Sequence, residues 1–357
     1  MKCLFVTTSN IGAGKQGDHI YSTQIYKALQ KTCSVEIFQF RQKNNYIAAA
    51  IFFFLPMMWV RNFSLQLAIT VLKERGKYDA ICIDHYRCAW ILLIAKLINK
   101  KALIFNHNLE SSVYKSLSKS SDASLHSRLF CYFEYTKVLL SEKIIFRLAH
   151  GLCSISCDDI PSNIKCYSQV LPPYSASPLS TEKMPEKPTA IIIGSFHWRL
   201  KQHNLIVFLD AFYELYKKKQ NYCSVIVAGS APRSFFSLIE RAYPFVTIIE
   251  SFDDLSELVG VATVGVCPDQ AGGGFKLKTL DYFKLGLPML AIDNGASGLI
   301  ESVVPSYNSF ELLAKEVYVL LDDDKQRRHL LHRQKNYFLQ YHSESSFLEI
   351  IEAFIEQ

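Results

Sequence analysis

Short apolar runs alternate with amphipathic stretches through the first 170 residues of the chain. Apolar residues recur at helical spacing in residues 18–30, 88–98 and 130–148. Residues 2–8 read as a buried strand, and further short strand-like segments lie at residues 34–40, 79–83, 102–105 and 152–156. Strands that alternate with helices favour a parallel sheet covered by helices. The first half of the chain therefore predicts one α/β domain.

A second strand and helix series follows a proline-rich stretch. Residues 171–189 contain five prolines and little apolar periodicity, which indicates a linker. After it, the pattern predicts strands at residues 190–193, 224–228, 246–249, 264–267 and 289–292, with helices at 203–216 and 254–261. Residues 309–357 read as helical with two polar breaks.

We therefore expect an α/β protein with two Rossmann-like domains that face each other across a cleft. The expected parts are a first domain at residues 1–172, a linker at 173–189, a second domain at 190–340, and a C-terminal helix at 341–357 that can pack back on the first domain. Ligands of such sheets bind at the carboxyl ends of the strands, so the cleft is the expected site.

Composition narrows the class of protein. The 357 residues are 49% hydrophobic and 20% charged, which excludes a disordered chain. A net charge of +6 suits anionic ligands or an anionic membrane face but is too small to indicate a nucleic-acid partner. The ten cysteines show no CxxC pair, so we expect no metal site and a reducing, cytoplasmic location.

The most apolar stretch, residues 47–60, is too short to span a bilayer and is interrupted by Pro56. One interpretation, favoured for the apolar part, is a helix buried on the first domain. The other is an interfacial surface, because Arg41, Lys43 and Arg61 flank the stretch. The second interpretation predicts peripheral contact with the anionic inner face of a membrane.

A glycine run opens the most informative motif, CPDQAGGGFKLKTLDYFKLGLP. Gly272, Gly273 and Gly274 follow a predicted strand, and Lys276, Lys278 and Asp281 then come at helical spacing. Glycines permit close backbone approach, and a helix N-terminus attracts anions. The motif indicates a phosphate-bearing ligand, and the alternative is a solvated surface of lysines and aspartate.

A second motif, GSFHWRLKQHN, places Arg199 and Lys201 at the start of a predicted helix. Two cations there can bind a diphosphate, since Arg offers a bidentate fork and Lys a point charge. The alternative is an ordinary basic loop.

The first domain carries two weaker signals. Gly12, Gly14 and Gly17 have dinucleotide-fingerprint spacing, but the second strand lacks the usual acidic residue at its end. In FNHNLES, His107 ends a predicted strand with polar neighbours, which favours a functional role over a purely structural hydrogen bond.

These motifs together resemble those of GT-B-fold glycosyltransferases, most closely the retaining group known as family 4, over nearly the whole chain. HNLE at residues 107–110 is similar to their HNxE, and GSFHWRLKQHN is similar to their G-S-x-x-W/Y-x-x-N segment. Residues 253–290 match their long D-D-L to G-x-P-V pattern. Where many members have two glutamates, this chain has Gly273 and Asp281.

The resemblance implies transfer of a sugar from a nucleotide-diphosphate sugar to a glycan or lipid-linked acceptor, with retention, in bacterial surface polysaccharide synthesis. The implied reaction needs no metal and no cofactor beyond the donor. The implied catalytic residues are His107, Arg199 and Lys201. The implied donor-binding residues are Gly17, Gly272, Gly273, Gly274, Phe275, Lys276, Lys278 and Asp281, and the implied acceptor-side residues are Asp18, His19, Asn108 and Glu110. The alternatives are a non-catalytic partner that binds nucleotide-sugar or glycan, and a nucleotide-sugar epimerase.

Overall fold

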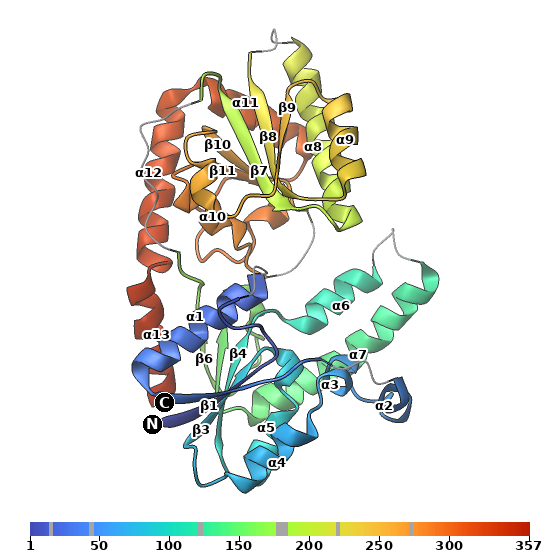
Figure 1. The fold of residues 1–357 in the computed structure, drawn as a ribbon, viewed down its shortest axis with the longest axis vertical. Coiled ribbons are helices and arrows are strands. Elements are labelled where there is room, and N and C mark those ends of the chain that lie inside the picture. Colours follow the sequence, from blue (N-terminus) through green and yellow to red (C-terminus); the bar gives the residue numbers. More distant parts are fainter. Residues whose placement is uncertain (14–16, 43–45, 120–123, 176–184, 219–221, 271–273) are drawn as a thin grey trace. The chain divides into compact units, whose positions relative to one another are not determined.

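The computed structural model describes the chain except for residues 14–16, 43–45, 120–123, 176–184, 219–221 and 271–273. It divides into two compact units (Figure 1). Unit 1 contains Met1–Pro173 and Ser345–Gln357, and unit 2 contains Tyr174–Glu344. The linker is predicted at residues 173–189. Its first residue, Pro173, belongs to unit 1, and its other described residues belong to unit 2.

Unit 1 is built on a parallel sheet with the order β2-β1-β3-β4-β5-β6. Its strands are β1 (Lys2–Thr7), β2 (Ser34–Gln39), β3 (Ala80–Asp84), β4 (Lys101–Asn106), β5 (Gly151–Ser154) and β6 (Tyr167–Val170). The chain moves from β1 outward to β2, then returns to place β3 on the other side of β1. This reversal makes the carboxyl ends of β1 and β3 the switch point of the sheet, where doubly wound folds bind ligands.

Helices cover both faces of this sheet. Side chains of α3 (Met57–Arg61), α4 (Leu65–Lys73), α5 (Ile91–Leu97) and α7 (Leu125–Leu148) share one apolar core with β1, β3 and β4. On the other face, α1 (Gly17–Thr32) buries Tyr21 and Ile25, and α13 (Glu344–Glu356) packs Phe354 against Phe105 with ring centroids 5.5 Å apart. Two further helices are α2 (Tyr46–Ile51) and α6 (Glu110–Ser118).

Unit 2 repeats the design with the order β12-β11-β10-β7-β8-β9, all parallel. Its strands are β7 (Thr189–Ser195), β8 (Ser224–Ser230), β9 (Val246–Glu250), β10 (Val264–Cys267), β11 (Met289–Ile292) and β12 (Ser306–Tyr307). Its helices are α8 (Arg199–Lys218), α9 (Arg233–Ala242), α10 (Lys278–Lys284), α11 (Phe310–Asp322) and α12 (Asp324–Tyr341). The switch point of this sheet lies between β7 and β10.

Most predicted elements lie within a few residues of the observed ones, but two predictions are wrong. The helix expected at residues 254–261 is a single 3₁₀ turn, Leu255–Leu258, closed by a capping box between Asp254 and Glu257. The apolar stretch at 47–60 is not a helix buried on the first domain. It breaks into α2 and α3 at Pro56, and only its second part, with Trp59, enters the core.

Candidate functional site

Three lysines gather around one buried aspartate at the switch point of unit 2. Asp269 lies just beyond the end of β10, Lys201 is in the first turn of α8, and Lys276 and Lys278 lie at the start of α10. The Nζ atom of Lys278 is 2.7 Å from Oδ2 of Asp269, and Nζ of Lys201 is 3.9 Å from the same oxygen. We call these four residues the lysine cluster.

Electrostatics inside the lysine cluster favour an added anion. Burial opposes the ionisation of Asp269, yet Lys278 and Lys201 hold the pKa of its carboxyl below the ordinary value. Burial lowers the pKa of Lys201 and of Lys276, with Asp269 acting in the opposite direction. One carboxylate cannot neutralise three ammonium groups, so the cluster keeps excess positive charge, the condition for binding a diphosphate.

A tyrosine fixes the start of α10 beneath the strand ends. The hydroxyl of Tyr282 donates to the carbonyl of Val266 (2.6 Å) and accepts from the backbone N–H of Ile193 (3.0 Å). Gly265 leaves room for the ring, because a Cβ at that position would lie 2.5 Å from Tyr282. The helix that carries Lys278 and Asp281 is therefore held to both β7 and β10.

The other predicted donor residues are placed around this helix. The carbonyl of Gly274, whose φ is +68°, accepts from the Ser297 hydroxyl at 3.0 Å. Phe275 is buried, and Arg199 is exposed at the first position of α8. Burial raises the pKa of Asp281 to about 6, against the opposing effect of Lys278 and Lys284. Gly272 and Gly273 lie outside the described residues.

A second polar cluster occupies the switch point of unit 1. Asp84 ends β3, and its Oδ1 atom is 2.8 Å from Nε2 of His107. Its other oxygen accepts from the hydroxyls of Thr7 (2.5 Å) and Ser22 (2.8 Å). Burial opposes the charge of Asp84, but His107 and the hydroxyl groups hold the pKa of this carboxyl below its ordinary value.

His85 extends this cluster toward α1 and α6. Its backbone has φ of +68°, an uncommon conformation for a non-glycine residue that often accompanies functional sites. Its Nε2 atom lies 2.9 Å from Nη2 of Arg87 and 3.5 Å from Oε1 of Glu110. Burial lowers the pKa of His85 well below its ordinary value and raises the pKa of Glu110 to about 7. We call Asp84, His85, Arg87, His107 and Glu110 the histidine cluster.

The structure thus brings some predicted residues of unit 1 together. His107 is buried, with its ring 4.9 Å from that of Tyr21 and 4.8 Å from that of His85. Asp18, near the start of α1, accepts from Arg87 at 3.3 Å and so adjoins the cluster. Gly17 is the first residue of α1, and His19 of the same helix is partly buried. Asn108, which follows His107 in the sequence, is also partly buried. Among the described residues, no three His, Cys, Asp or Glu side chains gather as metal ligands would.

Sequence reasoning missed four residues of the two clusters: Asp84, His85, Arg87 and Asp269. A signal was present for Asp84 and His85, because both follow directly on the apolar run of a predicted strand. Asp269 carries a similar signal, because it lies two residues after Cys267, the last residue of a predicted strand.

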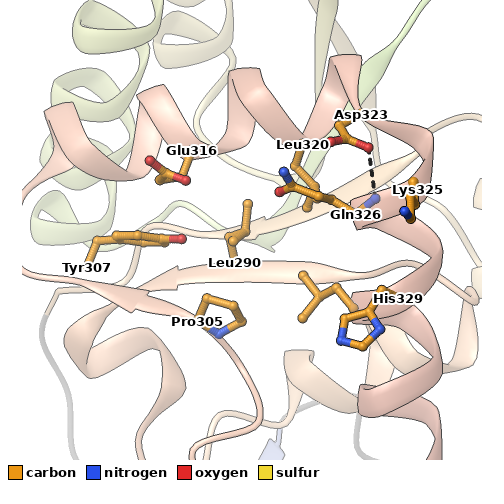
Figure 2. A pocket seen from close by; sticks show the side chains of 10 residues that line it. Leu290, Pro305, Tyr307, Glu316, Leu320, Asp323, Lys325, Gln326 and His329 are labelled. Carbon is orange, nitrogen blue, oxygen red and sulfur yellow. Dashed lines mark hydrogen bonds between the residues drawn. The ribbon is translucent and has the colours of Figure 1, made fainter.

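A well-formed cavity lies elsewhere in unit 2. It measures about 500 Å³ and lies among β11, β12, α11 and α12, as Figure 2 shows. Its floor includes Leu290, and Asp323 on its rim accepts from the N–H of Gln326 as the N-cap of α12 (Figure 2). None of its lining residues belongs to the lysine cluster, so size alone does not mark the candidate site.

Comparison with known proteins identifies a family for unit 2. Residues 187–323 match the model of the family described as glycosyl transferases group 1. This segment contains the lysine cluster and Asp281. A comparison of the sequence with curated proteins finds no match.

Solved structures match the chain over its full length. HepE from Anabaena, in complex with UDP and glucose, has a TM-score of 0.67 at 14% identity, and 100% of each chain is covered. OtsA, a trehalose-6-phosphate synthase, has 0.66 at 10% identity, covering 100% of this chain and 99% of the other. WaaG, a glycosyltransferase involved in lipopolysaccharide biosynthesis, has 0.65 at 14% identity, covering 99% and 100%. The GT-B fold expected from the sequence is confirmed, and residues 187–323 of unit 2 match the family of glycosyl transferases group 1.

Proposed function

We propose that the protein transfers a sugar from a nucleotide-diphosphate sugar to an acceptor hydroxyl. The observation that carries the proposal is the lysine cluster, which collects excess positive charge at the switch point of a doubly wound sheet. The cluster lies inside the segment that matches glycosyl transferases group 1. A nucleoside diphosphate is the anion that such a site and such a family would share.

In the proposed reaction, the bond between the anomeric carbon and the diphosphate oxygen breaks. Negative charge then grows on the departing nucleoside diphosphate, and Lys201 and Lys278 stabilise it electrostatically. The acceptor oxygen forms the new bond to the anomeric carbon, and its proton passes to the departing diphosphate. Preorganised cations of this kind usually provide the largest stabilisation in group transfer. By resemblance, we expect retention of configuration.

Asp281 is proposed to hold the ribose. Its carboxyl has a pKa of about 6, so it is mostly ionised at neutral pH and can accept hydrogen bonds from ribose hydroxyls. UDP is the nucleotide in the HepE structure, so uridine nucleotides are the first donors to test. Arg199, at the exposed start of α8, is proposed as an additional contact to the diphosphate.

The histidine cluster is proposed to serve the acceptor. Asp84 orients the ring of His107 through its contact with Nε2, and Asp18 forms an ion pair with Arg87. We expect a glycan or lipid-linked acceptor, consistent with surface polysaccharide synthesis on the cytoplasmic side. None of the helices in the described part of the chain combines the length and hydropathy that a membrane crossing requires.

A panel of nucleotide-sugars tests the proposal. A donor present at 100 times its Kd should stabilise the fold by about 2.7 kcal/mol, which a thermal-shift measurement detects. The same donors are then assayed for slow hydrolysis and for transfer to simple glycosides. If no nucleotide-sugar stabilises the protein, the proposed function is wrong. Binding without turnover favours the non-catalytic alternative, and interconversion of the sugar without an acceptor favours an epimerase.

A further inference from the structure

Unit 1 exposes an unusual set of large apolar side chains next to α2. Phe52, Phe53 and Phe54 follow this helix directly, and Phe53 and Phe54 are 72% and 60% exposed. Ile47 and Ile51, within α2, are also exposed. Soluble surfaces carry isolated apolar side chains, but consecutive exposed phenylalanines indicate contact with something apolar.

The long helix α7 adds an exposed apolar stripe. Leu125, Leu129, Phe133, Leu140 and Ile144 are all exposed. Their spacing of four and seven residues puts them on one side of the helix. The opposite side is apolar as well, since it buries residues such as Val138 and Ile145 in the core of unit 1. The outer side of α7 therefore exposes apolar side chains to water, and contact with another apolar surface would bury them.

Two contacts join these features into one surface. The Nζ atom of Lys137 on α7 donates to the carbonyl of Phe53 at 3.0 Å. The carboxylate of Glu134, also on α7, accepts from the backbone N–H of Met57 at 2.9 Å. The segment that contains Phe52, Phe53 and Phe54 is therefore hydrogen-bonded to α7. We call this surface the apolar face; its members are Ile47, Ile51, Phe52, Phe53, Phe54, Leu125, Leu129, Phe133, Leu140 and Ile144.

The chain segments that carry the apolar face are basic. In the sequence, no acidic residue occurs between Glu36 and Glu74, and the described residues of this stretch include Arg41 and Arg61. On α7, the two glutamates, Glu134 and Glu142, are buried. The exposed charged residues of α7 are Arg128, Lys143 and Arg147. An apolar surface with a basic margin complements an anionic lipid surface.

We infer that the apolar face docks unit 1 onto an anionic lipid bilayer. A second copy of this chain is the competing occupant. In a two-fold symmetric dimer the same patch would face itself, so the arginines and lysines of both copies would be brought together. Their repulsion disfavours the dimer, whereas anionic headgroups neutralise them. The inference is independent of the proposed transfer reaction, because neither cluster contributes a residue to the apolar face.

Vesicle flotation of the full chain, without donor, tests the inference. We compare phosphatidylcholine vesicles with vesicles that also contain about 30% phosphatidylglycerol. The protein should float with the anionic vesicles at low salt, bind them more weakly at high salt, and bind pure phosphatidylcholine poorly.

Matched variants locate the surface. Phe53→Ser and Leu129→Ser should each weaken vesicle binding by about tenfold, because each removes one large buried apolar contact with the lipid. Arg128→Gln combined with Lys143→Gln should also weaken binding, but only to the anionic vesicles. Leu238→Ser and Leu312→Ser are the controls. They remove equally exposed leucines of unit 2 (47% and 45%) and should leave binding unchanged.

Three results would overturn the inference. The first is no flotation of the unaltered protein with anionic vesicles at low salt. The second is equal binding by the Phe53→Ser, Leu129→Ser and control variants. The third is a dimer in solution that Phe53→Ser dissociates, without vesicle binding, which would assign the face to a second copy. Unfolding temperature confirms that each variant folds, and donor binding by thermal shift reports separately on the proposed function.

Discussion

Lys278 and Asp269 form an ion pair of 2.7 Å at the carboxyl end of β10, and Lys201 approaches the same carboxylate from α8. Without a ligand, Asp269 is the anion that keeps three buried or half-buried lysines together. A bound diphosphate would supply further negative charge to the same cations. The pair therefore links the stability of unit 2 to occupation of the proposed donor site.

Asp269→Asn should lower the unfolding temperature and enlarge the stabilisation by UDP. Removing one partner of a buried ion pair costs about 3 kcal/mol, because the other charge stays buried. Bound UDP should restore part of the lost free energy of unfolding. Thermal unfolding with and without UDP measures both effects. Glu214→Gln, which breaks the exposed pair with Lys217, is the control and should change little. An Asn variant as stable as the unaltered protein would show that the ion pair has no structural role.

Lys201→Met and Lys278→Met should each reduce kcat by about 10²–10³, the usual loss when a group that stabilises transition-state charge is removed. Lys217→Met, at the other end of α8, should leave turnover unchanged. Arg199→Ala tests the exposed cation of the same helix. If Arg199→Ala keeps full activity while the two lysine variants lose theirs, the lysine cluster and not Arg199 stabilises the leaving diphosphate. Full activity of all of them would contradict the proposed site.

Asp281→Asn should change the pH dependence of stability. The folded-state pKa of about 6 lies above the ordinary value of 3.8, so the folded state binds the proton more tightly. Stability is therefore lost as pH rises from about 4 to about 6. The Asn variant avoids this cost and should be more stable by about 1–3 kcal/mol at pH 8, with no difference at pH 3.

Urea unfolding at several pH values measures the effect of Asp281→Asn, with the exposed Asp293→Asn as control. Affinity for UDP should fall in Asp281→Asn if the carboxylate holds the ribose. A stability difference that does not vary with pH would refute the raised pKa, and an unchanged affinity would refute the contact with ribose.

His107→Ala should lower kcat while leaving the Kd for UDP unchanged, because His107 belongs to unit 1 and the lysine cluster to unit 2. Asp84→Asn should lower kcat as well, since Asp84 positions the ring. Steady-state kinetics and UDP titration separate the two quantities. His126→Ala, an exposed histidine of unit 1, is the matched control. If His107→Ala turns over as fast as the control, His107 is a structural residue.

Turnover should persist in EDTA, because Lys201, Lys276 and Lys278 can supply positive charge where the diphosphate departs. The assay compares initial rates before and after chelation. Activity lost in EDTA and restored by Mn²⁺ or Mg²⁺ would contradict this prediction.

Local sequence determined much of the fold. Apolar runs and helical periodicity located most strands of both sheets, because side chains that face a core must recur with the period of their element. The same local spacing put Lys278 and Asp281 one turn apart at the start of α10. The family resemblance depended on such short, ordered motifs, and the family match over residues 187–323 confirms it.

Only the tertiary structure decided which distant residues meet. No local pattern states that β10 pairs with β7, yet that pairing brings Asp269 to Lys201. Likewise, the placement of β3 beside β1 brings Asp84 to Thr7. The exposure of Phe53 was also undecided, since an apolar side chain looks the same in a sequence whether it is buried or exposed. Periodicity reports which side of an element is apolar, whereas pairing and burial depend on long-range packing across the whole chain.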